Sequence, residues 1–211
     1  MFVVETEAGT AALIIIGALL FVIAIIGRQI KEIGLAEGLF TLADLKEVLR
    51  NTQAPEDLLT LASAASTTAP EIGRDPEIRN LTHLAYEQLV AKSLMPIFGQ
   101  GAVETAGPYD RPFDIAVKLD GKKAGIETKF DRSDRYFSRN RMLMTVDRII
   151  RNSPDTDAVI IVSNMHEPSL HDLDVAREKA EASGKTFQYI RWNPDSDTAQ
   201  LERVIRDHLQ S

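Results

Sequence analysis

The chain has 211 residues, the length of one ordinary domain with or without an appendage. Hydrophobic residues make up 44% of it and charged residues 26%, which is enough apolar material for a core without disulfides. The absence of cysteine excludes a disulfide framework, a thiolate metal site and a cysteine nucleophile, and the formal net charge of -7 excludes binding to nucleic acid through bulk positive charge.

An uncharged apolar stretch covers residues 8–27 near the N-terminus. A helix of about 20 residues spans roughly 30 Å, the thickness of a bilayer core. Glu5 and Glu7 stand where a signal peptide would carry positive charge, and no cleavage site follows the stretch. We therefore predict a transmembrane anchor within residues 1–27, with a buried core helix as the alternative.

The flanking charges predict the orientation of this anchor. Arg28 and Lys31 lie just after the span, and no lysine or arginine lies before it. The positive-inside rule then predicts a single-pass protein of the inner, cytoplasmic membrane, with its C-terminal domain in the cytoplasm.

A short helical segment is expected over residues 28–61, next to the membrane. Thr41 and Asp44 resemble a capping box ahead of an amphipathic run. Residues 62–75 are rich in Ala, Ser, Thr, Pro and Gly, a composition typical of a flexible linker. We place the domain boundary in that linker.

Residues 76–211 alternate between helical and strand patterns. Asp120-Gly121 is a hairpin signal, and the continuous apolar run 158–163 is typical of a buried parallel strand. This order predicts an α/β fold, an α/β/α sandwich around a mixed central sheet. In chain order we expect helix, three strands, helix, strand, helix, strand and helix, over residues 76–98, 102–105, 112–119, 124–130, 133–152, 158–163, 171–183, 186–192 and 198–209.

Three charged residues are expected to meet at one end of this sheet. Residues two apart in a strand face the same side, so Glu127 and Lys129 project together. The hairpin brings Asp114, at the start of the preceding strand, beside them. Buried charges cost on the order of several kcal/mol unless they are paired or bind a metal. The pattern therefore predicts a hard-oxygen site for Mg²⁺ or Mn²⁺, with Asp114, Glu127 and the Thr128 carbonyl as ligands.

Such a site suits phosphodiester hydrolysis. The reaction needs a nucleophilic water and stabilisation of the charge that builds on the phosphate, and a divalent cation supplies both. Lys129 would orient the water, help to deprotonate it and stabilise the transition state. The alternative is a half-exposed sheet on which these side chains are ordinary surface pairs.

The segment Pro112-Phe113-Asp114, then twelve residues, then Glu127-Thr128-Lys129 resembles the motif of the PD-(D/E)xK nuclease superfamily. The resemblance covers about residues 76–193. It implies the restriction endonuclease-like fold and a Mg²⁺-dependent deoxyribonuclease with Asp114, Glu127 and Lys129 in its active site.

Residues 85–89 also look like the first helix of the methylation-dependent restriction endonuclease (Mrr-like) group. A helix glutamate often joins the metal site in that group, which implies this role for Glu87. The segment from Asp110 to Asp114 is similar to the group's D-x-G-x-D turn, with Pro112 where glycine is usual. By analogy the resemblance implies defence against foreign DNA.

Basic and aromatic residues alternate after the motif, as they do in proteins that bind nucleic-acid backbones. A solvated amphipathic helix is the alternative for this stretch. The arginines that we expect to bind nucleic acid are Arg132, Arg135, Arg139 and Arg141.

Together these features predict a membrane-anchored endonuclease that faces the cytoplasm and cuts DNA, with RNA left open. One site per chain favours a homodimer, or a larger complex at the membrane, for cutting both strands. The rival hypotheses are a catalytically silent nuclease-fold module, which binds nucleic acid or assembles a membrane complex, and a membrane protein with a sensor domain.

Overall fold

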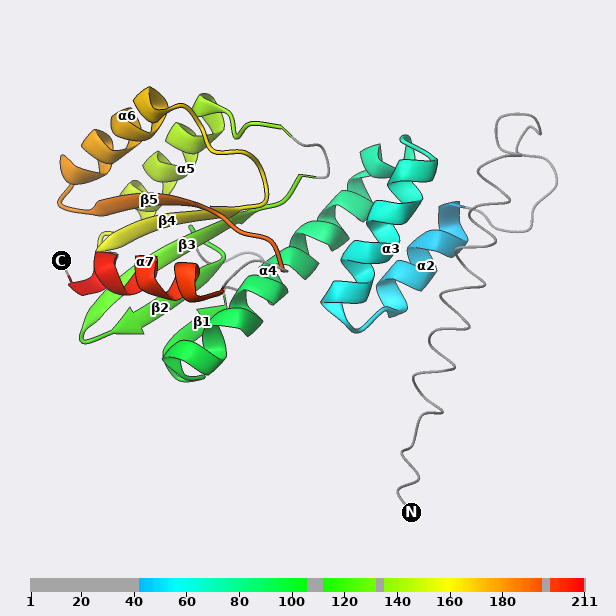
Figure 1. Ribbon diagram of the computed structural model, residues 1–211, viewed down its shortest axis with the longest axis horizontal. Helices are drawn as coiled ribbons and strands as arrows, with labels where there is room; N and C mark the ends of the chain where they lie inside the picture. The colour runs from blue at the N-terminus through cyan, green and yellow to red at the C-terminus, as the bar shows by residue number, and fades with distance from the viewer. Residues whose placement is uncertain (1–41, 106–111, 132–134, 195–197, 211) are drawn as a thin grey trace, which may run out of the picture. The chain divides into compact units, whose positions relative to one another are not determined.

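The computed structural model describes residues 42–105, 112–131, 135–194 and 198–210 (Figure 1). They belong to two compact units, one ending at Leu81 and the other beginning at Thr82. The predicted span over residues 8–27 and the first part of the predicted helical segment, residues 28–41, lie outside the described residues. Within the described ranges, no helix is long and apolar enough to cross a bilayer.

The first unit is helical. Leu45 and Leu49 of its first helix are buried, four residues apart on one face. Asp75 caps the helix that begins at Pro76, because its Oδ1 accepts hydrogen bonds from the backbone amides of Glu77 and Ile78 at 2.9 and 3.2 Å. The elements are α2 (Leu42–Asn51), α3 (Pro55–Thr68), η1 (Ile72–Arg74) and the start of α4 (Pro76–Phe98).

The predicted linker over residues 62–75 is wrong in its first half. Helix α3 continues to Thr68, and Ala62 and Ala65 within it are buried. Alanine has the highest helix propensity of all residues, and small side chains at helical spacing allow close packing. The boundary between the units lies later than predicted, inside the continuous helix α4.

The second unit contains a five-stranded mixed sheet in the order β1-β2-β3-β4-β5. The first three strands are antiparallel, and β3, β4 and β5 are parallel. Asp120 and Gly121 have positive φ angles of 52° and 82°, the conformation of a type I′ hairpin turn. The strands are β1 (Val103–Thr105), β2 (Ile115–Leu119), β3 (Lys122–Lys129), β4 (Ala158–Ser163) and β5 (Thr186–Arg191).

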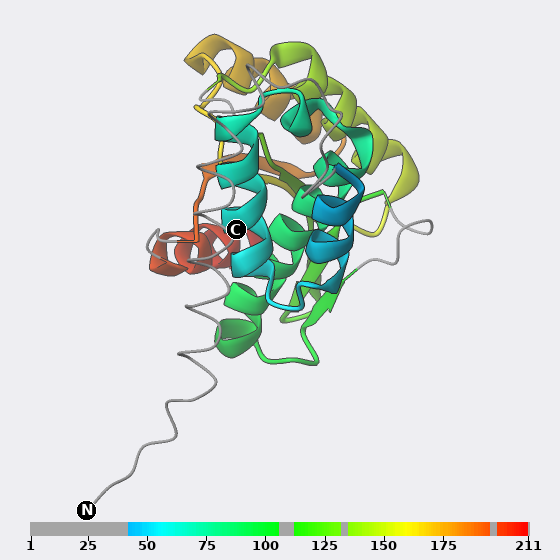
Figure 2. The ribbon, with the colours of Figure 1, turned by 90° about the vertical axis from the view of Figure 1, so that its right-hand side faces the viewer.

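Helices cover both faces of the sheet, as predicted. Helices α5 (Arg139–Asn152) and α6 (Leu170–Glu181) lie on one face, and α7 (Thr198–Gln210) crosses the other (Figures 1 and 2). Strand β4 is buried along its whole length, as its continuous apolar run predicts. A hydrophobic core cluster joins α5 and α6 to the sheet.

Tyr86 anchors helix α4 to the carboxyl ends of two strands. Its side chain is fully buried, and its hydroxyl donates a 2.7 Å hydrogen bond to the carbonyl of Trp192. Its ring centroid lies 5.3 Å from that of Phe130 and 5.9 Å from that of Trp192. These contacts hold α4 beside the strand ends that carry the predicted site.

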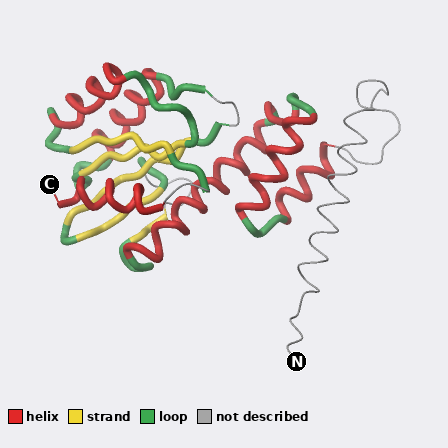
Figure 3. The backbone as a smooth tube through the Cα atoms, viewed as in Figure 1, coloured by secondary structure: helices red, strands yellow, loops and turns green. Residues whose placement is uncertain are grey.

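Helix α5 begins at Arg139, later than the predicted start at residue 133 (Figure 3). The residues before it are extended: the His166 amide donates to the Arg135 carbonyl, and the Phe137 amide donates to the His166 carbonyl. Phe137 is buried in the core, so tertiary packing outweighs the local helical pattern there.

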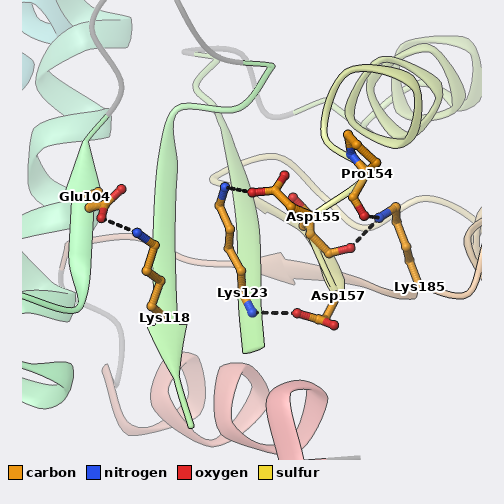
Figure 4. Close-up of polar contacts among 8 residues, drawn as sticks. Glu104, Lys118, Lys123, Pro154, Asp155, Asp157 and Lys185 are labelled. Atoms are coloured by element: carbon orange, nitrogen blue, oxygen red, sulfur yellow. Dashed lines mark hydrogen bonds and ion pairs between the residues drawn. The ribbon is translucent and has the colours of Figure 1, made fainter. Parts of the chain in front are cut away.

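The amino ends of the parallel strands are held by an ionic cluster (Figure 4). The Lys123 amide donates to Asp157 Oδ2, and its ammonium lies 2.7 Å from Asp155 Oδ2. The ammonium of Lys185, which is 6% exposed, donates to the carbonyls of Pro154 and Thr156. The predicted catalytic residues lie at the opposite ends of these strands.

Candidate active site

Asp114 is positioned by the residue before it. The ring of Phe113 is 2% exposed and lies so close to Gly125 of β3 that a Cβ atom there would stand 2.8 Å from Phe113 Cδ1. Gly125 therefore allows Phe113 to pack on the sheet, which fixes Asp114 just before the first residue of β2.

Asp114 is also tied directly to β3. Its Oδ2 accepts two hydrogen bonds of 2.7 Å from Thr128, one from the backbone amide and one from the hydroxyl. Both bonds go to the same oxygen. Within the described parts of the chain, Oδ1 of Asp114 makes no hydrogen bond, so it is the oxygen available to a further ligand.

Glu127 is the buried centre of the site. It is 2% exposed, in the middle of a mixed sheet. Its Oε1 accepts from the Lys129 ammonium, as the spacing of two residues predicts, and lies 2.5 Å from Arg148 Nη2 of α5. Its Oε2 is buried and has no hydrogen-bond partner within the described residues.

The electrostatics of Glu127 reflect this burial. Burial raises its pKa, and the charge of Asp114 raises it further, while Lys129 and Arg148 oppose the shift. The two cations therefore do not fully compensate for the desolvation of this carboxylate.

Glu87 of α4 lies within electrostatic reach of the same group. Its pKa is raised to about 7, mainly by burial and further by the charges of Asp114 and Glu127, while Lys129 opposes the shift. The side chain is half-buried. The helix glutamate is thus electrostatically coupled to both predicted carboxylate ligands and to the lysine.

His83, one turn before Glu87, is a site residue that the sequence analysis did not select. Burial lowers its pKa, Lys129 lowers it further, and Asp114 opposes them. A hydrogen bond to the Thr128 backbone favours the charged ring, so the ring donates and the Thr128 carbonyl accepts. Its i, i+4 spacing from Glu87 was the available signal, because such residues share a helix face.

Arg148 is the second residue that the sequence analysis did not place in the site. Its side chain is 47% exposed, yet its guanidinium reaches the buried Glu127. No local pattern indicates this contact, because it depends on how α5 packs across the sheet.

The predicted nucleic-acid-binding arginines are exposed where they are described. Arg135, Arg139 and Arg141 all face solvent, while Arg132 lies outside the described residues. The Arg139 Nε lies 3.5 Å from Asp172 Oδ1, and the Arg141 Cζ lies 5.8 Å from the centroid of the Phe137 ring.

A divalent cation fits this site in part. No three acidic or histidine side chains among the described residues lie close enough together to form a metal centre in this arrangement. The buried Oε2 of Glu127 and the Oδ1 of Asp114 are nevertheless hard-oxygen donors without hydrogen bonds in the described region. Glu87, coupled to both, is the third acidic side chain of the group.

No family model matches this chain, and no curated protein matches its sequence. Among the described residues, the site combines a buried carboxylate with one unpartnered oxygen, a second carboxylate beside it, and a lysine and an arginine on the other oxygen of the first.

Proposed function

We propose that this chain is a metal-dependent endonuclease with a restriction endonuclease-like fold, which hydrolyses the phosphodiester bonds of DNA. The observation that carries the proposal is the buried Oε2 of Glu127, which lacks a hydrogen-bond partner in the described residues. A buried carboxylate oxygen without a partner is destabilising. A divalent cation held with Asp114 would supply that partner.

Asp114 and Glu127 would hold Mg²⁺ or Mn²⁺, with the Thr128 carbonyl and Glu87 as further ligands. When bound, the cation lowers the pKa of a water molecule and neutralises charge on the phosphate. The Thr128 carbonyl has two lone pairs, so its bond with His83 leaves one of them for a ligand.

The remaining steps belong to the chain's own side chains. Lys129, held by Oε1 of Glu127, orients the attacking water and stabilises charge on the phosphate. Glu87 is half-buried and is electrostatically coupled to Asp114, Glu127 and Lys129, which is consistent with its role as a further ligand. The exposed side chains of Arg135, Arg139 and Arg141 hold backbone phosphates.

The choice of DNA rests on the resemblance to PD-(D/E)xK nucleases, as does a role in defence against foreign DNA. Residues 8–27 would anchor the enzyme in the cytoplasmic membrane with its nuclease domain inside. A homodimer would place two sites on a duplex and cut both strands.

One observation favours a catalytically silent module instead. Lys129 and Arg148 both neutralise Oε1 of Glu127, which is the arrangement of a structural ion-pair network. Such a module would bind nucleic acid or assemble a membrane complex without cutting. Calorimetric titration with Mn²⁺ separates the two functions, since the silent module predicts no binding at millimolar metal.

The nuclease proposal is tested with the full-length protein in a neutral detergent and supercoiled plasmid. We expect nicking with Mg²⁺ or Mn²⁺ and none in excess chelator. Lys129→Ala and Asp114→Asn should each lower the rate about 100-fold or more, because Lys129 stabilises charge on the phosphate and Asp114 would hold the cation.

Lys118→Ala and Asp155→Asn are matched controls, since both side chains form ion pairs outside the site. They should cut like the parent. Site variants that cut as fast as these controls would overturn the mechanism. The anchor is tested separately by membrane fractionation: a chain that lacks residues 1–27 and still sediments with the membrane would overturn it.

A further inference from the structure

A cavity of about 400 Å³ opens beside the start of α5 and α6, outside the group of catalytic residues. Its volume is within the range of sites for small ligands. Its lining includes Tyr136, Phe137, Arg139, Glu167, Ser169 and Asp172.

Tyr136 presents an aromatic face at this cavity. Its side chain is 74% exposed, although its neighbour Phe137 is buried in the core. The backbone on either side is fixed, since the His166 amide donates to Arg135 at 2.9 Å and the Phe137 amide donates to His166 at 3.0 Å. An exposed aromatic ring on a fixed backbone is a preorganised stacking surface.

His166 extends this surface. Its ring centroid lies 5.2 Å from that of Tyr136, and the two planes are inclined by 34°. Its Nδ1 lies 3.0 Å from Nη1 of Arg191. Because a guanidinium can only donate, Nδ1 accepts, and a cation is held next to the aromatic pair.

The charged residues in the cavity lining are one arginine, Arg139, and two carboxylates, Glu167 and Asp172. Arg139 lines it with a side chain that is 47% exposed, and Arg135 and Arg141 face solvent nearby in the chain. The acidic lining is partly compensated, because Asp172 accepts from the Ser169 hydroxyl at 2.8 Å and pairs with Arg139. A fixed aromatic face among arginines is the chemistry that binds single-stranded nucleic acid.

The cavity lies at the same edge of the sheet as the catalytic group. Strands β3 and β4 are parallel neighbours, with Lys129 opposite Ser163. The Asn164 side chain then bridges the strand ends, accepting from the Asp131 amide at 2.9 Å and donating to its carbonyl at 2.6 Å. Ligands of parallel sheets bind at the carboxyl ends of the strands, so one nucleic-acid strand can run from the carboxylates to the cavity.

We propose that this cavity binds the base of an unpaired nucleotide, stacked on Tyr136, in the nucleic-acid strand that the catalytic group acts on. Arg139 contacts the phosphate of that nucleotide. The inference rests on the proposed nuclease function and adds a preference for single-stranded or locally unpaired substrate, because a paired base cannot reach the ring.

The test measures binding without cleavage, using the full-length protein in detergent with excess chelator. The probe is a single strand of about twelve nucleotides, within the usual site size, with one 2-aminopurine whose fluorescence is quenched on stacking. The same strand annealed to its complement is the duplex probe. Tyr136→Ala and Tyr136→Phe are compared with Met144→Ala, a control that removes another exposed side chain (71%) from the same region of the chain.

Tyr136→Ala should weaken single-strand binding by at least about fivefold, the lower limit for one base–aromatic stack, and abolish the quench. Tyr136→Phe and Met144→Ala should bind and quench like the parent, and duplex affinity should change less. The proposal is overturned if Tyr136→Ala binds like the parent or if Met144→Ala loses as much. Equal loss in Tyr136→Phe also overturns it, since phenylalanine still stacks.

The experiments distinguish a failure of the stacking site from a failure of the proposed nuclease function. A parent protein that quenches the probe but never cuts with Mg²⁺ or Mn²⁺ overturns the nuclease and supports the stacking site. A parent that cuts normally with Tyr136→Ala binding unchanged supports the nuclease and overturns the stacking site.

Discussion

Arg148 and Glu127 form an ion pair of 2.5 Å between a side chain that is 47% exposed and one that is 2% exposed. The arginine comes from α5 and the glutamate from β3, so the pair joins a helix to the buried strand. A buried carboxylate that loses a partner is strongly destabilising. The pair therefore contributes both to the fold and to the charge of the candidate site.

We predict that Arg148→Gln lowers the free energy of unfolding by about 1–3 kcal/mol, because Glu127 then loses one of its two cationic partners among the described residues. Urea denaturation measures the change. Arg151→Gln is the matched control, since Arg151 donates to the Asp147 carbonyl on the exposed surface of the same helix. In a Glu127→Gln background, Arg148→Gln should lower the free energy of unfolding by less. An equal loss in both backgrounds would show that the ion pair with Glu127 does not cause the destabilisation.

The environment of Glu87 is expected to make the free energy of unfolding depend on pH. Its pKa in the folded chain is raised from 4.5 to about 7, so folding favours its protonated form. That contribution is complete below the unfolded pKa and is lost as the pH rises through about 7. Glutamine cannot ionise. The free energy of unfolding of Glu87→Gln should therefore rise relative to that of the parent between about pH 4.5 and 7, and the difference should stay constant above about pH 7.

The measurement is urea denaturation of both proteins at several pH values across this window. Glu178→Gln, at an exposed position on α6, is the control and should follow the parent at every pH. A constant difference between Glu87→Gln and the parent from pH 4 to 8 would contradict the assigned environment.

Replacing Gly125 with alanine is expected to disturb the packing of the core. An added Cβ would lie 2.8 Å from Phe113 Cδ1, closer than atoms pack, so Gly125→Ala must displace a buried ring next to Asp114. We expect a loss of about 1–3 kcal/mol in the free energy of unfolding, the usual cost of overpacking. Gly101→Ala is the control, because nothing lies within 4 Å of its added Cβ. Phe113→Leu should restore part of the loss in the Gly125→Ala background; if it does not, the Phe113 contact is not the cause.

Local signals predicted most of the second unit. Helix α4 occupies the predicted range, from Pro76 to Phe98. Asp120-Gly121 forms the predicted turn, and the apolar run 158–163 is the buried parallel strand. The pairing of Lys129 with Glu127 follows from the two-residue period of a strand. These features depend on neighbours in the chain, which is why the sequence carries them.

The features that escaped prediction depend on contacts between distant residues. Arg148 reaches Glu127 only because α5 packs across β3. The delayed start of α5 depends on the pairing of Tyr136 with His166, which follows the next strand along the chain. Residues 62–68 were misassigned for another reason: their small side chains are typical of linkers, but alanine also packs well as a helix face.

Lys185 is expected to stabilise the fold at the amino ends of the parallel strands. Its buried ammonium donates to the carbonyls of Pro154 and Thr156 in the turn between α5 and β4 (Figure 4). Lys185→Met fills similar space but leaves those carbonyls without this donor, so we expect a loss of about 1–3 kcal/mol in the free energy of unfolding. Lys118→Met is the control: Lys118 pairs with Glu104 at 2.5 Å, but its side chain is 51% exposed, and such pairs contribute about 0–1 kcal/mol. Equal urea midpoints for the two variants would show that Lys185 does not hold the turn. Because the cluster lies at the end of the sheet away from Glu127, Lys185→Met should leave Mn²⁺ affinity unchanged under conditions where the protein is folded.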